Sequence, residues 1–306
     1  MSEKVTRKVD FQELVKAGVH FGHQTSRWCP KMAPYIWGYK NNVHLIDVSK
    51  TAFQLEKAAK FLESVAAEGK TILWVGTKKP AQAIVQATAN SLHQPYVNHR
   101  WIGGTLSNHP QVKKSVTKLL HFEDIVSKSE KFPHYTKKEF NVFQKMINRL
   151  EKNIGGIRNL HWPLGALVLV DVTKERSALK EAAATGIPVV ALVDTNGDPS
   201  LVNYVIPAND DAPRAIKVVI DYLASAVQQG KETAKAHGKE KQVTEKVVTP
   251  EIDESVALAL AQAAKDVEEE SVKAKSRAAL AEENKKKLHK KASLEDELEV
   301  TAVEKK

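Results

Sequence analysis

The chain has few groups that could cross-link it, carry it through a membrane or direct its export. Its single cysteine, Cys29, excludes an internal disulfide framework and is typical of a reducing compartment. No apolar run approaches the ~20 residues that a membrane-spanning helix needs. The first ten residues lack the apolar core of a signal peptide. We therefore expect a cytoplasmic protein that does not enter a membrane.

Acidic side chains are missing from two long stretches of the N-terminal half. None occurs between Glu68 and Glu123 or between Leu14 and Ile46, although 37 of the 306 residues are acidic. Residues 1–165 hold 25 Lys or Arg against 12 Asp or Glu, whereas residues 166–230 hold 5 against 8. Basic tracts without acids, interleaved with aromatic side chains, favour a polyanionic partner, and nucleic acid above all.

Aromatic side chains are absent from the C-terminal quarter. All 19 precede Gly230, and residues 231–306 contain blocks of like charge instead. Without aromatic side chains, and with so many charges, such a segment buries too little apolar surface to offset the entropy lost on folding. We expect a charged tail over 231–306 that is mostly disordered, with transient helix over 254–292. A partner-binding helix in the tail is the alternative.

Helix and strand patterns alternate through the remainder, which predicts an α/β core from residues 1–109 and 156–230. Apolar runs predict strands over 72–76, 96–101, 166–172, 189–194 and 204–207, and helical spacing predicts helices over 49–68, 81–93, 175–185 and 212–228. Ser49 is the expected N-cap of the first of these helices. This order favours a mostly parallel sheet with helices on both faces.

Residues 110–155 interrupt the alternation with a predicted antiparallel helical hairpin of coiled-coil character. Apolar residues recur at spacings of three and four in its second half, and Val112, Val116, Leu119 and Val126 continue the seam in its first half. A capping box, Thr136 to Glu139, predicts where the second helix begins.

Residues 18–44 have neither helical nor strand periodicity but combine five aromatic side chains with cations. Cations bind phosphates, and flat rings stack on unpaired bases. We expect Phe21 and Trp37 to pack on the core, with Arg27, Trp28 and Lys31 near RNA. The alternative is that the aromatics only pin a long loop to the core.

Two later segments extend the predicted RNA surface. The turn Val75–Lys79 lies between a strand and a helix, where backbone N–H groups can collect a phosphate; a plain basic turn is the alternative. Residues 98–108 combine Arg100 with a glycine pair. The predicted RNA-binding residues are His20, His23, Arg27, Trp28, Lys31, Lys40, Lys78, Lys79, His99, Arg100, Trp101, Asn108, Lys113, Lys114 and Lys118.

Acidic residues follow two predicted strands of the second half. Asp194 ends one strand, and Asp210 and Asp211 follow the next. Carboxylates at the C-terminal ends of parallel strands converge on the crevice where such folds bind ligands. Oxygen ligands suit Mg²⁺, so these three aspartates are a candidate magnesium site. The alternative is that they cap turns and helices.

Several long blocks resemble the bacterial ribosomal protein S2 family over about residues 8–230. They are AGVHFGHQTSRWCPKM, PYIWGYKNNVHLIDVSKT, ILWVGTKKPAQ, YVNHRWIGGTLSN, LEKNIGGI and IPANDDAPRAIK. The resemblance implies a Rossmann- or flavodoxin-like domain with a protruding coiled-coil hairpin. It also implies binding to 16S rRNA and a platform for the mRNA-capturing ribosomal protein S1. Cys29 stands where the family usually has Asn, and the tail is longer than the common form.

These observations favour a non-enzymatic structural component of the 30S subunit, whose partners are 16S rRNA and small-subunit proteins including S1. No small-molecule substrate is expected. His99 lacks a nearby nucleophile or orienting carboxylate in the sequence, which argues against catalysis. One alternative is an α/β enzyme that binds a phosphorylated small molecule near Gly76 and Asp194. Another is a coiled-coil adaptor that binds only protein.

Overall fold

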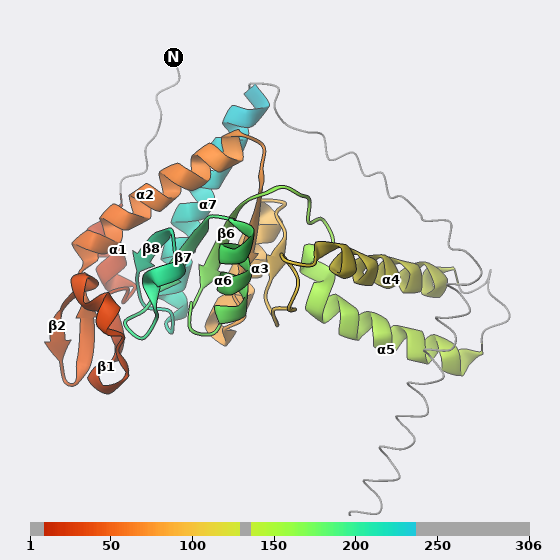
Figure 1. Ribbon diagram of the computed structural model, residues 1–306, viewed down its shortest axis with the longest axis horizontal. Helices are drawn as coiled ribbons and strands as arrows, with labels where there is room; N and C mark the ends of the chain where they lie inside the picture. The colour runs from red at the N-terminus through yellow and green to blue at the C-terminus, as the bar shows by residue number, and fades with distance from the viewer. Residues whose placement is uncertain (1–8, 129–135, 237–306) are drawn as a thin grey trace, which may run out of the picture. The chain divides into compact units, whose positions relative to one another are not determined.

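The larger of two sheets forms the centre of the structure (Figure 1), a computed structural model that describes residues 9–128 and 136–236. Its strands are β4 (Thr71–Val75), β5 (Tyr96–Val97), β6 (Leu164–Val170), β7 (Val189–Val193) and β8 (Tyr204–Pro207). They lie in the order β5-β4-β6-β7-β8, and all neighbours are parallel. If the five strands of this sheet are numbered 1 to 5 along the chain, their spatial order is 2-1-3-4-5, as in flavodoxin-like folds. The predicted parallel sheet is confirmed.

Helices cover both faces of this sheet, as predicted (Figure 1). The helices α2 (Val48–Ala67), α3 (Lys79–Ser91) and α7 (Pro213–Ala236) pack on one face, and α6 (Arg176–Thr185) packs on the other. The short α1 (Phe11–Lys16) packs on α2 and α7. Trp74 joins the core under these helices, while its neighbour Leu73 faces the opposite side and is equally buried. Burial on both faces explains the continuous apolar runs in the sequence.

Two predicted boundaries of this domain are wrong. Asp47, not Ser49, caps α2, because its carboxylate accepts a hydrogen bond of 3.0 Å from the Ser49 amide. The strand β5 stops at Val97, four residues short of the prediction. The residues that follow it leave the sheet and form a loop that is held by a side chain from α6, described below.

The expected start of the tail also lies inside a helix. α7 continues to Ala236, so residues 231–236, predicted as tail, are helical. Gly230 allows α7 to cross α2 closely, since an added Cβ would lie 2.4 Å from the Glu63 carbonyl oxygen. Glycine here marks a close helix contact rather than a helix end. The rest of the predicted disordered tail lies outside the described residues.

Residues 21–46 form a second, antiparallel sheet that the sequence did not predict. Its strands are β1 (Phe21–Gln24), β2 (Ile36–Lys40) and β3 (Val43–Ile46), in the order β1-β3-β2, with 3₁₀ turns at Thr25–Arg27 and Pro30–Tyr35. Both pairings contain register shifts, which break the alternation that reveals a strand. One local signal was present: Asn41 and Asn42 adopt φ of 50° and 60° between β2 and β3, as a tight hairpin turn requires.

The expectation that Phe21 and Trp37 pack on the core is wrong. Phe21 is 49% exposed and Trp37 is 76% exposed. A small antiparallel sheet can leave one face open to solvent, so alternate side chains face outward however apolar they are.

The helices predicted in residues 110–155 are α4 (His109–Ser127) and α5 (Lys137–Ile154), which lie side by side (Figure 1). The rings of Phe122 and Phe143 stack with centroids 5.5 Å apart. The capping box at Thr136 is confirmed. In α4 the seam contains Phe122 and Ile125 rather than Val126, which is only half-buried. The predicted tip lies outside the described residues, and the coiled-coil character stays a prediction.

Candidate functional site

Polar side chains from four strands meet at the carboxyl edge of the parallel sheet. Lys78 follows β4, Asp171 follows β6, Asp194 follows β7, and Asp210 and Asp211 follow β8. The ends of β4 and β6 border the crevice where flavodoxin-like folds bind ligands. Protein side chains occupy this crevice, because Lys78 Nζ lies 3.5 Å from Asp171 Oδ2.

Lys78 is an ion-paired, largely buried amine. Its Nζ lies 2.8 Å from Asp210 Oδ1 and 2.7 Å from Asp211 Oδ1. Burial lowers the pKa of Lys78, but the hydrogen bonds to these two carboxylates outweigh it and hold the pKa above its ordinary value. The sequence placed Lys78 among the RNA-binding cations, whereas the structure directs its charge toward protein acids.

The turn after β4 also uses its backbone N–H groups within the protein. The Gly76 amide donates to the Val97 carbonyl at 2.9 Å, and the Thr77 amide donates to Glu175 Oε1 at 3.1 Å. Glu175 is buried, and desolvation raises its pKa even though the hydrogen bonds from Thr77 lower it. The phosphate-collecting arrangement expected for this turn is therefore not formed by Gly76 and Thr77.

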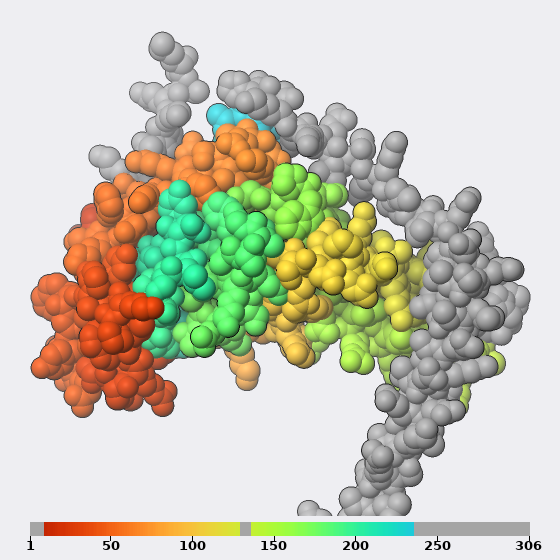
Figure 2. Space-filling model, in the orientation of Figure 1, coloured from red at the N-terminus to blue at the C-terminus, as the bar shows by residue number. Residues whose placement is uncertain are grey.

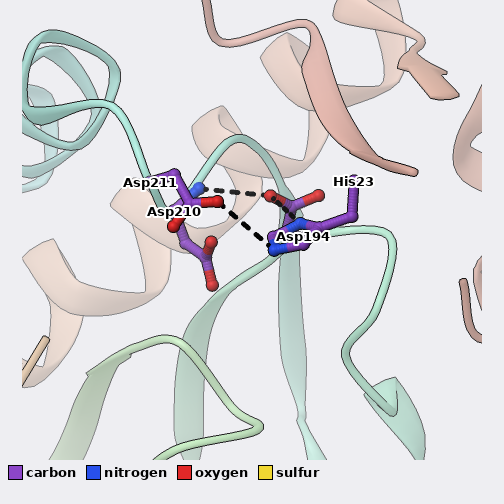
Figure 3. Close-up of side chains that lie close together, drawn as sticks. All are labelled: His23, Asp194, Asp210 and Asp211. Carbon is purple, nitrogen blue, oxygen red and sulfur yellow. Dashed lines mark hydrogen bonds and ion pairs between the residues drawn. The ribbon is translucent and has the colours of Figure 1, made fainter. Parts of the chain in front are cut away.

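His23, from β1, completes the carboxylate cluster (Figure 3). Its Nδ1 lies 3.0 Å from Asp194 Oδ2, and its Nε2 lies 3.3 Å from Asp211 Oδ2. The contact with Asp194 raises the pKa of His23, and burial only partly opposes it. The sequence assigned His23 to RNA, but the structure places it among the three aspartates of the predicted metal site.

Asp210 is the most constrained carboxylate of the group. Its side chain is 1% exposed, and its Oδ2 has no hydrogen-bond partner among residues 9–128 and 136–236. Burial, with Asp171 and Asp194 nearby, raises the pKa of Asp210 to about 7 despite the Lys78 contact. One donor atom from each of His23, Asp194, Asp210 and Asp211 lies within 4.8 Å of the others. This arrangement can hold one cation.

Thr195 fixes the antiparallel sheet against the end of β7. Its hydroxyl oxygen accepts from the His23 amide at 2.9 Å, and its carbonyl accepts from the Cys29 amide at 2.7 Å. Gly22 is needed at this contact, since an added Cβ would lie 2.6 Å from Thr195 Cγ2. Figure 2 shows the N-terminal residues, in red, against the teal residues near 200.

Most of the predicted RNA-binding cations are exposed. Six of them have no ion pair within residues 9–128 and 136–236: Arg27, Lys40, Lys79, Arg100, Lys113 and Lys114. Two others are engaged: Lys31 pairs with Asp198 at 2.9 Å, and Lys118 lies 5.6 Å from the centre of the Phe122 ring. The basic surface is thus smaller than the sequence predicted.

The uncharged residues predicted to bind RNA lie in different environments. His99 and Asn108 are exposed, and Trp28 is 39% exposed, with its ring 5.3 Å from that of His44. His20 is half-buried, and burial lowers its pKa. Trp101 is buried, which argues against stacking on a base.

Sequence reasoning missed Glu181, which organises the loop after β5. Its carboxylate accepts from Trp101 Nε1 at 3.1 Å and from the amides of Gly104 and Leu106 at 2.9 and 3.0 Å. Burial raises the pKa of Glu181, but these hydrogen bonds outweigh it and lower the pKa overall. Glu181 lies 80 residues from Trp101, so no local pattern could indicate the contact.

Comparison with known families agrees with this architecture. A family model described as ribosomal protein S2 matches residues 14–230, more than two thirds of the chain. The match includes both sheets, the α4–α5 pair and the carboxylate cluster. Among the described residues, no helix combines the length and apolar character needed to cross a membrane.

Proposed function

The chain belongs to the ribosomal protein S2 family, and from that premise we propose that it binds 16S rRNA through its exposed cations. Family membership makes it a ribosomal protein with a structural role in the small subunit. That subunit is a ribonucleoprotein that takes part in translation. The 16S rRNA contact, a cytoplasmic location and the absence of catalysis belong to the proposal.

The unpaired cations carry the proposal. All six come from the two acid-free tracts, and all have exposed side chains. An unpaired surface lysine or arginine can release counterions from a phosphate backbone, and this release drives much of nucleic-acid binding. Three acids of the second half, Asp171, Asp210 and Asp211, contact Lys78 rather than these cations.

Neutralising these cations should weaken rRNA binding and flatten its salt dependence. In the test variant, glutamine replaces Arg27, Lys40, Lys79, Arg100, Lys113 and Lys114. Each lost phosphate contact should remove ~0.7–0.9 from the slope of log K against log salt concentration. The slope is measured by filter binding to 16S rRNA. Lys57, Lys60 and Lys217, exposed but outside the tracts, provide a control variant. Equal slopes for the two variants would contradict the proposal.

We also propose that the antiparallel sheet contributes to docking ribosomal protein S1. Trp37 and Tyr39 on β2 are 76% and 73% exposed. Exposed aromatic side chains are enriched where proteins bind one another. Small subunits that contain Trp37→Ala should retain less S1 on a sucrose gradient than wild-type subunits. If the variant subunits retain as much S1 as wild-type subunits, Trp37 does not contribute to the interface.

A bound divalent cation is the third part of the proposal. The sequence suggested magnesium, held by Asp194, Asp210 and Asp211. His23 adds an imidazole nitrogen to these oxygen donors, and a mixed nitrogen and oxygen set suits Zn²⁺ better than Mg²⁺. The buried Oδ2 of Asp210 lacks a partner, and a cation would satisfy it. We therefore propose zinc, with the cation tying β1 to the ends of β7 and β8.

The enzyme alternative has little support from the site. The Gly76 and Thr77 amides are used within the protein, and Lys78 is neutralised by aspartates. The phosphorylated small molecule was expected near Gly76 and Asp194, in the crevice that these groups border. We propose that the chain is not an enzyme.

A further inference from the structure

A polar groove lies beside β5, at the opposite edge of the sheet from β8. It has a volume of about 400 Å³ and is lined by Gln82 and Gln86 of α3, by Asn98 and His99, and by the end of α5 with the turn after it. Binding pockets for small ligands span ~300–1,000 Å³. The groove is separate from the carboxylate cluster, with which it shares no residue.

The floor of the groove is rigidly packed. Tyr96 of β5 lies against Gly156, where an added Cβ would come within 2.3 Å of the Tyr96 carbonyl oxygen and 2.8 Å of its ring. Only glycine allows this approach. The end of α5 therefore lies close to β5.

Amide side chains line one wall of the groove, and the hydrogen bonds they make within the protein determine which of their polar atoms stay available to a ligand. Gln82 and Gln86 lie one helical turn apart on α3. Gln82 Nε2 donates to the Thr77 carbonyl at 3.0 Å, and Asn98 Nδ2 donates to Gln86 Oε1 at 3.0 Å. These bonds fix the amides and leave Gln82 Oε1, Asn98 Oδ1 and Gln86 Nε2 for other partners. The wall thus presents acceptors and a donor close together.

The opposite wall contains one cation, Lys152, and one carboxylate, Glu151. Lys152 is exposed and has no ion pair in the described part of the chain. The one carboxylate that lines the groove, Glu151, lies 3.3 Å from Arg158 Nη2. The neighbouring Arg100 is also exposed, and no ion pair of its side chain occurs among the residues that the structure describes.

We propose that this groove binds one unpaired base of an RNA strand, with Lys152 at the adjoining phosphate. Unpaired bases are recognised by hydrogen bonds to their edges, where donors and acceptors alternate, and asparagine and glutamine amides match that pattern. A neutral amide wall opposite a single cation fits a base with its phosphate better than it fits a peptide. The inference rests on the proposed rRNA binding and adds a specific site to it.

The test uses small subunits reconstituted with the full chain and probed with dimethyl sulfate and a carbodiimide. These reagents together modify the pairing edges of all four bases. The test variant is Gln86→Ala with Asn98→Ala. Gln12→Ala is the control, on α1, which packs on α2 and α7. One unpaired nucleotide protected by the wild-type chain should become several-fold more reactive in the test variant only, while the other protections persist.

If the double variant folds poorly, the same probing is repeated with Lys152→Ala, which alters only an exposed side chain. This variant should expose the same nucleotide. If both variants enter subunits and no protected nucleotide changes, the groove does not bind a base, while the proposed function stands. If the wild-type chain itself fails to enter subunits or to protect any nucleotide, the proposed function fails, and this inference fails with it.

Discussion

At the scale of single residues, sequence neighbours with the same charge have different roles. Lys78 and Lys79 are adjacent in one acid-free tract, yet Lys78 contacts three aspartates, while Lys79 is exposed and has no ion pair within the described part of the chain. The difference arises because Lys78 ends the loop after β4 and faces the sheet edge, whereas Lys79 begins α3. A lysine's role thus depends on which acids the fold brings near it.

The proposed zinc site gives a prediction at this scale. At ~100 times its dissociation constant, a cation that binds only the folded state adds ~2.7 kcal/mol of stability. Zn²⁺ should therefore raise the melting temperature of the wild-type chain more than Mg²⁺ does, as measured by calorimetry. His23→Ala should lose most of the zinc response, because it removes the only nitrogen donor of the cluster.

His93→Ala is the control for this measurement, since His93 is an exposed histidine outside the cluster. It should respond to zinc as the wild-type chain does. If zinc still raises the melting temperature of His23→Ala, the cation binds elsewhere. If magnesium raises the melting temperature of the wild-type chain more than zinc does, the three aspartates bind magnesium, as the sequence suggested.

At the scale of elements, the α4–α5 pair has an apolar seam of its own. Val112, Val116, Leu119, Phe122 and Ile125 of α4 are buried, as are Phe143, Ile147 and Ile154 of α5. None of these residues belongs to the main core cluster under α2, α3 and α7. Arg158, which follows α5, donates to Glu123 of α4 at 3.0 and 2.6 Å and joins the two segments at the surface.

A cavity in this seam should destabilise the pair without unfolding the sheet. Phe143→Ala removes a buried ring that stacks on Phe122, and such truncations cost ~3–5 kcal/mol. Hydrogen exchange should show lost protection confined to α4 and α5, with β4, β6 and β7 unchanged. Gln144→Ala, at the exposed neighbouring position, is the control. Equal loss of protection in the parallel sheet would make the pair part of the main core.

At the scale of the whole molecule, the basic and acidic groups among the described residues lie in different places, the free cations at the surface and most of the clustered aspartates in the interior. The acid-free tracts leave unpaired cations exposed, whereas the acids of residues 166–230 include the four aspartates that gather at the carboxyl edge of the sheet. The protein can therefore present a basic surface to RNA even though its second half is acidic. Long-range attraction toward RNA depends on the exposed cations and falls as salt rises.

The C-terminal boundary gives a prediction at the same scale. A chain that ends at Ala236 should melt within a few degrees of the full chain, because residues 237–306 contain no aromatic side chain and few large apolar ones. A chain that ends at Gly230 should be less stable. It loses Ala234, which is 3% exposed, and the contact from Lys231 to the Leu92 carbonyl. Calorimetry on the three chains tests this, and a marked drop for the chain ending at Ala236 would assign the tail a role in folding.

The sequence by itself determined the parallel strands, most of the helices and the family. These features depend on local patterns: strands buried on both faces are continuously apolar, helices repeat every three to four residues, and a capping box spans four residues. Local information sufficed even for the α4–α5 seam, except that Phe122 and Ile125 replaced Val126. The local pattern did not reveal the strands of residues 21–46. These strands are short and their register shifts, so apolar and polar side chains do not alternate regularly along them.

Only the tertiary structure decided which groups meet. Lys78 contacts Asp210 across 132 residues, His23 contacts Thr195 across 172, and Glu181 holds a loop 80 residues away. The first contact follows from the strand order, since parallel strands that are distant in sequence end at the same edge of the sheet. The other two depend on how the antiparallel sheet and α6 pack beside that sheet. Composition could show that the first half of the chain is basic. Which cations stay free for RNA depends on the order in which β4, β6, β7 and β8 lie side by side.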